Sequence, residues 1–396
     1  MRVVVAPDSY KGCLMAWDVA QAISRGVRAA LPEGCGEVIE LPVGDGGEGT
    51  ARAIAHAVPG AELVQAAVHD PLRRPVTAEF AMLPGRRAVV EMAAASGLGL
   101  LAEEERDPLA ADTYGTGELV RAALDRLLAG GDARPGPDGG GAKPQLILGV
   151  GGSATVDGGA GMLAALGVRF GDRSGHPLEA TYGGGGLSGI GRVDLSGLDP
   201  RLGLVDLVLA SDVGNPLLGS EGAAAVFGPQ KGATPAQVVE LDEALAVFRR
   251  TVLRDTGRDL AAHRGAGAAG GLGGAAVALL GAAFRPGIEL ALELADFDRL
   301  AQGAALVITG EGRYDCQTLS GKAVQGVAAA AARAGVPLVV LAGSVDPAAE
   351  WHLPGWAVVL SIADGPMPLA QSRDRAAGLL TAAARRAVYL YALGRR

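Results

Sequence analysis

The sequence predicts an α/β protein with two domains, and three observations support this class. The chain has 396 residues, which is more than one domain of about 100–200 residues usually holds. Hydrophobic residues make up 49% and charged residues 20%, a balance that is typical of a folded chain. Short apolar runs alternate with stretches of helical periodicity, as they do in sheets that helices cover.

The N-terminal part alternates strand and helix before its pattern changes. We expect a strand at Val3–Ala6, a helix at Ala16–Ala30 and a strand at Glu37–Val43, which runs into the glycine-rich turn GDGGEGT. Val64–Val68 and Val76–Phe80 are then expected to pair as antiparallel strands, because the turn HDPLRRP lies between them.

The alternation continues on both sides of the stretch 130–144, whose glycines and prolines are typical of a flexible surface loop. The expected strands are Ala88–Met92, Leu146–Val150, Asp206–Ala210, Ala304–Thr309, Val336–Ala342 and Ala357–Ile362. The expected helices are Thr116–Leu128, Gly158–Gly167, Pro235–Thr256 with Thr234 as its N-cap, Lys322–Ala334 and Leu369–Leu393.

The two chain ends resemble each other in this alternation, whereas the middle holds hairpin-like strands and glycine runs. The pattern therefore predicts one doubly wound parallel-sheet domain made from residues 1–60 and 295–396. A second α/β domain with a mixed sheet, residues 61–294, is expected to be inserted between those two segments.

Charge and cysteine content exclude several classes of partner. The chain carries 35 basic and 43 acidic residues, which disfavours a general nucleic-acid binder that needs a basic stripe. Its three cysteines form no CxxC and no zinc pattern. The opening MRVVVAPDSY is too short for a signal peptide, and no apolar run of about 18 residues is unbroken. We expect a cytoplasmic protein with no membrane partner.

Two acidic loops follow the first two expected strands, where ligand crevices form in such sheets. The loop APDSYKG places Asp8, Ser9 and Lys11 after the first strand. A cation near a helix start opposes the helix dipole, so Lys11 favours a bound phosphate or carboxylate there. The loop GDGGEGT carries Asp45 and Glu48, which can reach one cation or hydroxyl, or can simply favour a helix N-terminus.

Two further loops point to phosphate chemistry. Gly149–Gly159 follows an apolar strand, and its glycines let backbone N–H groups approach an anion. The same run fits G-x-G-x-x-A with Asp172 downstream, a weak outline of a dinucleotide fingerprint. After the strand ALVIT, the residues Glu311, Arg313, Asp315 and Lys322 bring two acids and two cations close together, although they do not form a P-loop.

Smaller polar loops complete the candidate set. Thr113–Glu118, Ser211–Pro216 and Gly228–Gly232 each combine small hydroxyls or glycines with a charge, and three of the four lysines lie in glycine-flanked turns. The five histidines form no HxxxH or HxH pair, which disfavours a His-rich metal site and a Ser–His hydrolase. Carboxylates, lysines, hydroxyls and backbone amides are the groups that phosphoryl transfer with Mg²⁺ uses.

Ten motifs in order resemble the bacterial glycerate kinase family. They are APDSYKG, PVGDGGEGT, HDPLRRPV, VVEMAAASGL, TYGTGEL, GVGGSATVDGGAGML, SDVGNPLLG, AAAVFGPQKGA, GAGAAGGLG and VITGEGRYDCQT with GK. The resemblance implies a flavodoxin-like domain with a second α/β domain inserted. It also implies ATP-dependent phosphorylation of D-glycerate, generally to 2-phosphoglycerate, with Mg²⁺ in the crevice between the domains.

With this resemblance, each candidate residue receives an expected role. Lys11, Arg313 and Lys322 should neutralise the glycerate carboxylate and the transferred phosphoryl group. Asp212, Glu311 and Asp315 are candidates for the Mg²⁺ ligands or the general base, with Asp8, Asp45 and Glu48 as competitors. The expected nucleotide-binding residues are Gly149, Gly151, Gly152, Ser153, Asp157, Lys231 and Thr309. The expected substrate-binding residues are Ser9, Thr113, Thr116, Asn215 and Thr318.

The chain departs from the family pattern at Tyr10, Cys13 and Val156, where Phe, Ser and Asn are more frequent. Val156 matters most, because it removes a polar side chain beside the candidate phosphate turn. Two alternatives stay open: an NAD-dependent oxidoreductase that uses the Gly149–Ala154 loop, and a non-catalytic binder of phosphorylated ligands. The sequence leaves open 2- against 3-phosphoglycerate, and a monomer against a small homo-oligomer.

Overall fold

The computed structural model describes residues 1–32, 36–44, 46–129, 143–178, 183–315, 323–350 and 355–394. The chain divides into two compact units, which are described separately. Unit 1 comprises Met1–Asp45, Arg52–Pro59 and Gly287–Arg396, and unit 2 comprises Gly46–Ala51 and Gly60–Pro286. Within the described ranges, no helix has both the length and the apolar character that a membrane crossing requires.

Unit 1 is built on a parallel five-stranded sheet in the order β13-β12-β11-β1-β2. Its strands are β1 (Arg2–Val5), β2 (Glu37–Glu40), β11 (Leu306–Tyr314), β12 (Leu338–Val345) and β13 (Ala357–Ser361). The chain leaves β1 for β2 on one side and returns to β11 on the other side of β1. This is the flavodoxin-like order, in which the first and third strands flank the switch point where ligands bind.

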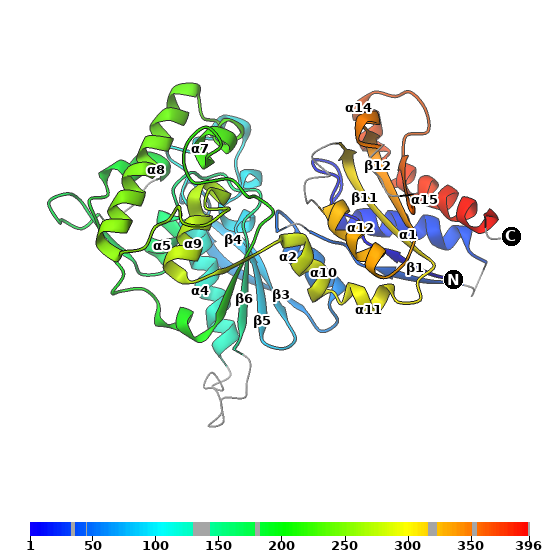
Figure 1. Cartoon of the computed structure of the whole chain (residues 1–396), viewed down its shortest axis with the longest axis horizontal. Coiled ribbons are helices and arrows are strands. Elements are labelled where there is room, and N and C mark those ends of the chain that lie inside the picture. The colour runs from blue at the N-terminus through cyan, green and yellow to red at the C-terminus, as the bar shows by residue number, and fades with distance from the viewer. Residues whose placement is uncertain are drawn as a thin grey trace. The chain divides into compact units, whose positions relative to one another are not determined.

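Helices cover both faces of this sheet, which is why its central strands carry buried apolar runs at Val3–Val5, Leu306–Ile308 and Leu338–Ala342. Val3 and Val5 pack in one buried cluster with α1 (Ala16–Ala30) and α15 (Ala376–Leu393), which lie side by side (Figure 1). Val4 points to the opposite cluster. That cluster is formed with α10 (Gly287–Leu294), α11 (Phe297–Ala301) and α12 (Ala323–Arg333). The shorter helices are α2 (Thr50–Ala57), which enters from unit 2, α13 (Pro347–Glu350) and α14 (Leu369–Asp374).

Unit 2 contains a mixed six-stranded sheet in the order β10-β9-β6-β5-β4-β3. The strands β3 (Glu62–His69), β4 (Pro75–Leu83) and β5 (Arg87–Glu91) form an antiparallel meander. The strands β5, β6 (Gln145–Gly149), β9 (Asp206–Ala210) and β10 (Ala283–Arg285) are parallel. A separate antiparallel pair joins β7 (Arg169–Gly171) and β8 (Arg192–Asp194).

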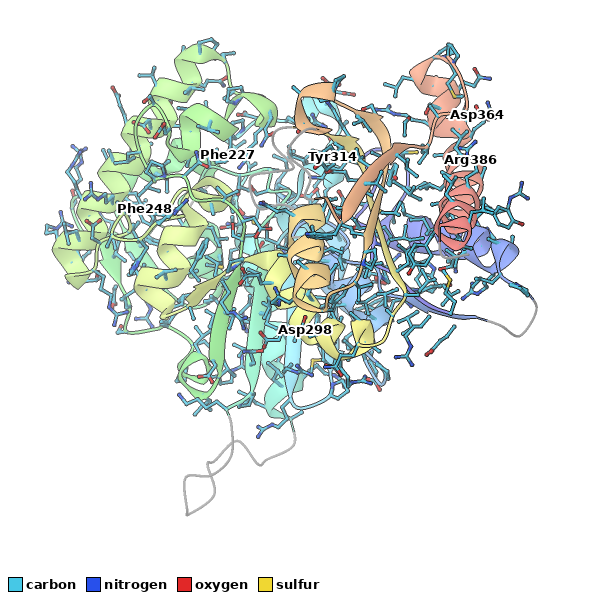
Figure 2. The ribbon with its side chains drawn as sticks, turned by 45° about the vertical axis from the view of Figure 1, so that its right-hand side comes forward. Phe227, Phe248, Asp298, Tyr314, Asp364 and Arg386 are labelled. Atoms are coloured by element: carbon cyan, nitrogen blue, oxygen red, sulfur yellow. The ribbon has the colours of Figure 1, made fainter. Side chains whose placement is uncertain are left out.

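Two buried clusters hold unit 2 together. Phe80, Leu148 and Leu209 belong to a cluster between the sheet and α4 (Tyr114–Leu128). The second cluster includes Phe248, labelled in Figure 2, which meets Phe170 edge-on with ring centroids 6.0 Å apart. The remaining helices are α3 (Ala93–Ser96), α5 (Ala160–Ala165), α6 (Gly183–Gly186), α7 (Ala223–Phe227), α8 (Pro235–Thr256) and α9 (Leu272–Leu280).

The structure confirms the α/β class and the doubly wound parallel sheet, and it corrects several element boundaries. The strand β11 runs to Tyr314, so Glu311 and Arg313 are strand residues rather than loop residues, because β12 pairs with β11 along this length. The expected helix Leu369–Leu393 is interrupted at Arg375. The expected strand at Glu37–Val43 ends at Glu40. Most of the predicted loop 130–144 lies outside the described residues.

Candidate functional site

In unit 1, the candidate residues gather at the carboxyl ends of β1 and β11, the switch point of the sheet. Asp8, Ser9 and Lys11 follow β1, while Glu311, Arg313 and Asp315 lie at the end of β11 or directly after it. The backbone N–H of Asp8 donates to the carbonyl of Gly310 at 3.0 Å, which fixes the start of the loop against β11. The topology therefore brings the loop APDSYKG together with the acidic and basic residues that follow ALVIT.

Buried hydroxyls anchor this loop. Thr309 is fully buried, and its Oγ1 donates to the carbonyl of Ala6 at 2.7 Å. The hydroxyl of Tyr10 donates to the carbonyl of Leu341 at 2.7 Å. Burial is the main cause that raises the pKa of Tyr10, and the charge of Glu311 adds to it. Thr309, an expected nucleotide ligand, thus ties two strands together in this structure.

The cations at this edge are accessible. Lys11 is exposed and forms no ion pair with a described residue. Arg313 is 71% exposed, and its Nε lies 3.3 Å from Oδ2 of Asp315. Asp8, Glu311 and Asp315 are half-buried. Unit 1 therefore presents two cations and three carboxylates at one sheet edge. Asp45, Thr318 and Lys322 lie outside the described residues.

In unit 2, three parallel strands end level with one another. Glu91, Gly149 and Ala210 are the last residues of β5, β6 and β9, and they are partners in the sheet register. The loops that follow these strands therefore share one edge, and they carry the motifs MAAASGL, VGGSATVD and SDVGNP.

The acidic turn Gly46–Thr50 packs on this edge. Gly151 donates its N–H to the carbonyl of Gly46 at 2.9 Å. The approach is close enough that a Cβ on Gly151 would lie 2.6 Å from Cα of Gly47. The buried carboxylate of Glu91 accepts from the N–H of Gly49 at 2.8 Å and from the N–H of Ala51. Glu48 itself is exposed. Sequence reasoning missed Glu91, although its place at a strand end was the available signal.

The glycine-rich turn after β6 is held by the segment after β5. Leu98 donates its N–H to the carbonyl of Gly152 at 2.9 Å, and Ala154 donates to the carbonyl of Ser96 at 2.9 Å. Gly152 adopts φ +73°, a left-handed conformation that favours glycine. The N–H groups of Gly152 and Ser153 donate to no described residue. Adjacent free N–H groups in such a turn form a concave anion site.

Lys231 lies behind this turn rather than at its surface. The side chain is buried, and Nζ donates to Oγ of Ser153 at 2.8 Å and to the carbonyl of Thr155 at 2.7 Å. Burial lowers the pKa of Lys231 to about 7, against an opposing effect of the Asp157 charge. The expected nucleotide ligand therefore contacts the turn from the protein interior.

Three further candidates form buried hydrogen bonds in the interior of unit 2. Oδ2 of Asp157 accepts from N and Oγ1 of Thr113 at 2.9 and 2.7 Å and from N of Gly161 at 3.0 Å. Its Oδ1 accepts from N of Gly159 at 3.0 Å. Oγ1 of Thr116 donates to the hydroxyl of Ser96 at 2.8 Å. Asp157 and Thr113 thus link the glycine-rich turn to α4 and α5, and Thr116 links α4 to α3.

The loop after β9 carries Asp212 and Asn215. Asp212 and Asn215 are both half-buried, and Nδ2 of Asn215 donates to the carbonyl of Glu221 at 2.9 Å. The carbonyl of Asn215 accepts from the N–H of Gly267, which lies in the glycine-rich run GAGAAGG at 265–271. Further along that run, a Cβ on Gly270 would lie 2.1 Å from the carbonyl oxygen of Thr155. The run therefore packs backbone against backbone on the candidate phosphate turn.

Two expectations from the sequence receive a structural answer. Val156 is fully buried in the cluster of Phe248, so its apolar side chain faces the core and not the turn's surface. Asp172 follows β7, which belongs to the separate two-stranded sheet. A dinucleotide fingerprint requires its acid beside the strand that carries the glycines. The placement of Asp172 therefore gives the dinucleotide interpretation no support.

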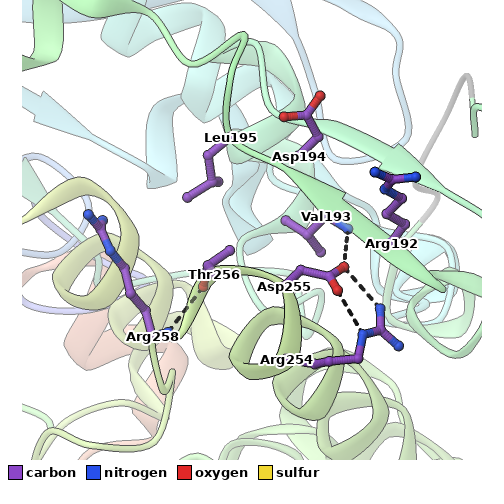
Figure 3. Close-up of a pocket in the computed structure, with 8 residues that line it drawn as sticks. All are labelled: Arg192, Val193, Asp194, Leu195, Arg254, Asp255, Thr256 and Arg258. Atoms are coloured by element: carbon purple, nitrogen blue, oxygen red, sulfur yellow. Dashed lines mark hydrogen bonds and ion pairs between the residues drawn. The ribbon is translucent and has the colours of Figure 1, made fainter.

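A cavity of about 530 Å³ lies elsewhere in unit 2 and contains none of the candidate residues. Figure 3 shows its lining, which comes from β8 with the adjacent Leu195 and from the end of α8 with the nearby Arg258. Its arginines are largely occupied: Arg254 pairs with Asp255 at 2.7 Å, and Arg258 donates to the carbonyl of Leu279 at 2.9 Å. The chemistry of the two sheet edges does not extend to this cavity.

Metal binding at these edges would involve few protein ligands. Across the described residues, no three His, Cys, Asp or Glu side chains converge as a metal cluster. Mg²⁺ commonly binds through one or two carboxylates together with phosphate oxygens and waters. Glu311 and Asp315 in unit 1 and Asp212 in unit 2 supply carboxylates of that kind. The donor set fits a metal held chiefly by its substrate.

Comparisons with known proteins agree along the whole chain. A model of the glycerate kinase family matches residues 3–392. The chain is 45% identical over 388 residues to a glycerate kinase of Bacillus subtilis, covering 97% of this chain and 96% of that one. It is 43% identical over 364 residues to the glycerate 2-kinase of Escherichia coli, covering 91% and 90%. The crystal structure of a chain described as glycerate kinase 2 from Salmonella typhimurium LT2 superposes with a TM-score of 0.81 at 40% identity, covering 100% and 99%. The chain belongs to the glycerate kinase family.

Proposed function

We propose that the chain transfers the γ-phosphoryl group of ATP to the 2-hydroxyl of D-glycerate, giving 2-phosphoglycerate and ADP. The observation that carries this proposal is the family match over residues 3–392, joined to relatives at 43–46% identity. Those relatives are glycerate kinases, and the E. coli relative is a glycerate 2-kinase. The geometry of both sheet edges supports the same chemistry.

Unit 2 supports the nucleotide half of the reaction. The N–H groups of Gly152 and Ser153, which donate to no described residue, lie on a turn that Lys231 contacts from behind. Such a turn binds a phosphate group through backbone donors, with a positive charge near the developing negative charge. We assign the phosphates of ATP to this turn, and the carboxylates Glu48 and Asp212 to its surroundings.

Unit 1 supports the acceptor half. Lys11 and Arg313 are the exposed cations of its sheet edge. An arginine can bind a carboxylate with two parallel hydrogen bonds, whereas a lysine acts as a point charge. We assign the glycerate carboxylate and the transferred phosphoryl group to these two cations. Asp8, Glu311 and Asp315 are the described carboxylates there that can take the proton from the attacking hydroxyl.

Mg²⁺ would be held by Glu311, Asp315 or Asp212, whose oxygens are the ligand type this ion prefers. When bound, it would neutralise charge on the phosphate oxygens. The residues themselves orient the two substrates and hold the proton, because positioning and charge stabilisation supply most of the catalysis in phosphoryl transfer.

The test is ADP release by the purified protein with Mg·ATP. We expect release to depend on D-glycerate, and to be at background with L-glycerate or D-lactate, which lacks the 3-hydroxyl. Lys11→Met and Arg313→Lys should impair it, whereas Lys143→Met, at an exposed lysine outside both edges, should not. An ADP release that D-glycerate does not stimulate would refute the proposed substrate.

A further inference from the structure

Lys231 carries a buried amino group whose described hydrogen-bond acceptors are both uncharged. Its side chain is 2% exposed, and its Nζ contacts the Ser153 hydroxyl and the Thr155 carbonyl. No described carboxylate lies within ion-pair distance of Nζ. An ammonium group in such a place is costly unless a negative charge compensates it.

The nearby carboxylate of Asp157 gives only partial compensation. Its charge acts on Lys231, but burial outweighs it and leaves the pKa of Lys231 at about 7. The oxygens of Asp157 already accept four hydrogen bonds, from Thr113, Gly159 and Gly161. The charge of Asp157 also raises the pKa of a second acid, Asp112, which pairs with Arg73. The backbone carbonyl of Arg106 packs on Gly232, the residue after Lys231. Neither Asp157 nor Asp112 forms an ion pair with Lys231 among the described residues.

The missing negative charge can come from the front of the same turn. Ser153 and Thr155, the acceptors of Lys231, flank Ala154 on the turn where the N–H groups of Gly152 and Ser153 donate to no described residue. Oγ1 of Thr155 is buried and has no hydrogen-bond partner among the described residues. A phosphate group on this turn would therefore bring its charge close to the amino group of Lys231, which has no ion-pair partner among the described residues.

We infer that Lys231 is a positioning residue that holds the phosphate turn from behind and takes up a proton from solvent when a nucleotide phosphate binds in front. The inference rests on the proposed nucleotide site. The step adds one proton to the neutral amine and breaks no other bond. An anion near the ammonium group favours its charged form, so the free protein at pH 8 is mostly neutral at Lys231 and the complex is mostly charged.

The experiment is calorimetric titration of the full-length protein with Mg·ADP at pH 8.0 in buffers of different ionisation enthalpy. At this pH the terminal phosphate of ADP has already lost its proton, so the ligand contributes little. We expect uptake of about 0.5–0.9 of a proton per nucleotide, and uptake close to zero at pH 6.0, where both states are protonated. Over the same range, affinity should fall by up to about tenfold per pH unit above pH 7.

Two variants separate a proton carrier from a merely structural residue. Lys231→Arg keeps a permanent charge, because arginine does not lose its proton, so it should bind Mg·ADP without proton uptake at pH 8.0. Lys143→Arg, at an exposed lysine, should keep the wild-type uptake. Wild-type protein that binds Mg·ADP without proton uptake and without the decline above pH 7 would overturn the inference, even if Lys231→Arg fails to fold. Wild-type protein that binds no nucleotide would overturn the proposed function as well.

Discussion

The carboxylate of Glu91 accepts a hydrogen bond from the backbone N–H of Gly49 at 2.8 Å. This contact joins the last residue of β5 to the acidic turn Gly46–Thr50, and a second contact from Ala51 holds the start of α2. An acid at a helix N-terminus stabilises free backbone donors and complements the helix dipole. Glu91 therefore fixes the turn that presents Glu48.

Glu91→Gln should lower both stability and turnover. The amide replaces one acceptor oxygen with an NH₂ group that cannot accept from a backbone N–H, which leaves a buried donor unsatisfied at a cost of about 1–3 kcal/mol. Urea unfolding and kcat measure the two effects. Glu62→Gln, at an exposed side chain with only a 3.9 Å ion pair, is the matched control. Unchanged stability and kcat in Glu91→Gln would show that the contact does not hold the turn.

Asp112 should make stability depend on pH. Burial and the charge of Asp157 raise the pKa of Asp112 to about 6, although Tyr114 and Arg73 oppose the shift. The folded state then binds more protons than the unfolded state between about pH 4 and pH 6, so this group destabilises the protein as pH rises through that window.

The free energy of unfolding should therefore fall as pH rises, and Asp112→Asn should remove about 1–3 kcal/mol of this fall. Urea unfolding of both proteins at pH 4.5 and pH 6.5 gives the difference. Asp298→Asn, at an exposed carboxylate, controls for the general effect of losing a charge. If the free energy of unfolding changes between pH 4.5 and pH 6.5 by the same amount in both variants as in wild type, the raised pKa of Asp112 is refuted.

Lys11→Met should reduce kcat/KM for D-glycerate by roughly 10²–10³-fold, the loss expected when one charge-stabilising donor is removed from a transition state. Lys11 is exposed, so the substitution should leave the unfolding midpoint unchanged. Steady-state kinetics at saturating Mg·ATP measure the loss, with Lys143→Met as control. Wild-type kinetics in Lys11→Met would remove this cation from the site.

The response of each variant's activity to Mg²⁺ should distinguish a general base from a metal ligand among the carboxylates at the two sheet edges. A variant of the general base should lower kcat by roughly 10²–10⁴-fold at every Mg²⁺ concentration. A variant of a metal ligand should instead recover part of its activity as Mg²⁺ increases. The panel is Asp8→Asn, Asp212→Asn, Glu311→Gln and Asp315→Asn, titrated with Mg²⁺ at saturating substrates. If none of the four loses activity, the assigned roles are wrong.

Gly270→Ala should destabilise unit 2 by more than about 1 kcal/mol, because φ is +68° there and a Cβ would lie 2.1 Å from the carbonyl oxygen of Thr155. Gly203→Ala, where a Cβ meets nothing within 4 Å, is the control. Thermal unfolding compares them. Equal midpoints would mean that the glycine run can move away from the phosphate turn without cost.

Local signals predicted individual elements well. The helices at Ala16–Ala30 and Pro235–Thr256 and the strand Asp206–Ala210 have the bounds expected from periodicity and capping. Thr234 and Gln237 form a capping box, which marks the residue at which the helix begins. The extension of β11 to Tyr314 was missed because it depends on pairing with β12, a partner that lies about 30 residues further along the chain.

Contacts between distant segments explain what the sequence could not show. Lys231 was expected to reach nucleotide from a glycine-flanked turn, but its acceptors Ser153 and Thr155 lie 78 and 76 residues away and turn it inward. Glu91 gains its role only when the turn at Gly49 meets the end of β5. The loops at strand ends could be predicted, whereas the side chains that hold those loops could not.

The central claim is phosphorylation of D-glycerate at its 2-hydroxyl, and ³¹P NMR of the product tests it most directly. The purified protein, incubated with Mg·ATP and D-glycerate, should give a new phosphomonoester signal split into a doublet by the single proton on C2. A triplet, split by the two protons on C3, would contradict the position of transfer and identify 3-phosphoglycerate. No new phosphomonoester signal, under conditions where ATP stays available, would contradict the kinase reaction itself.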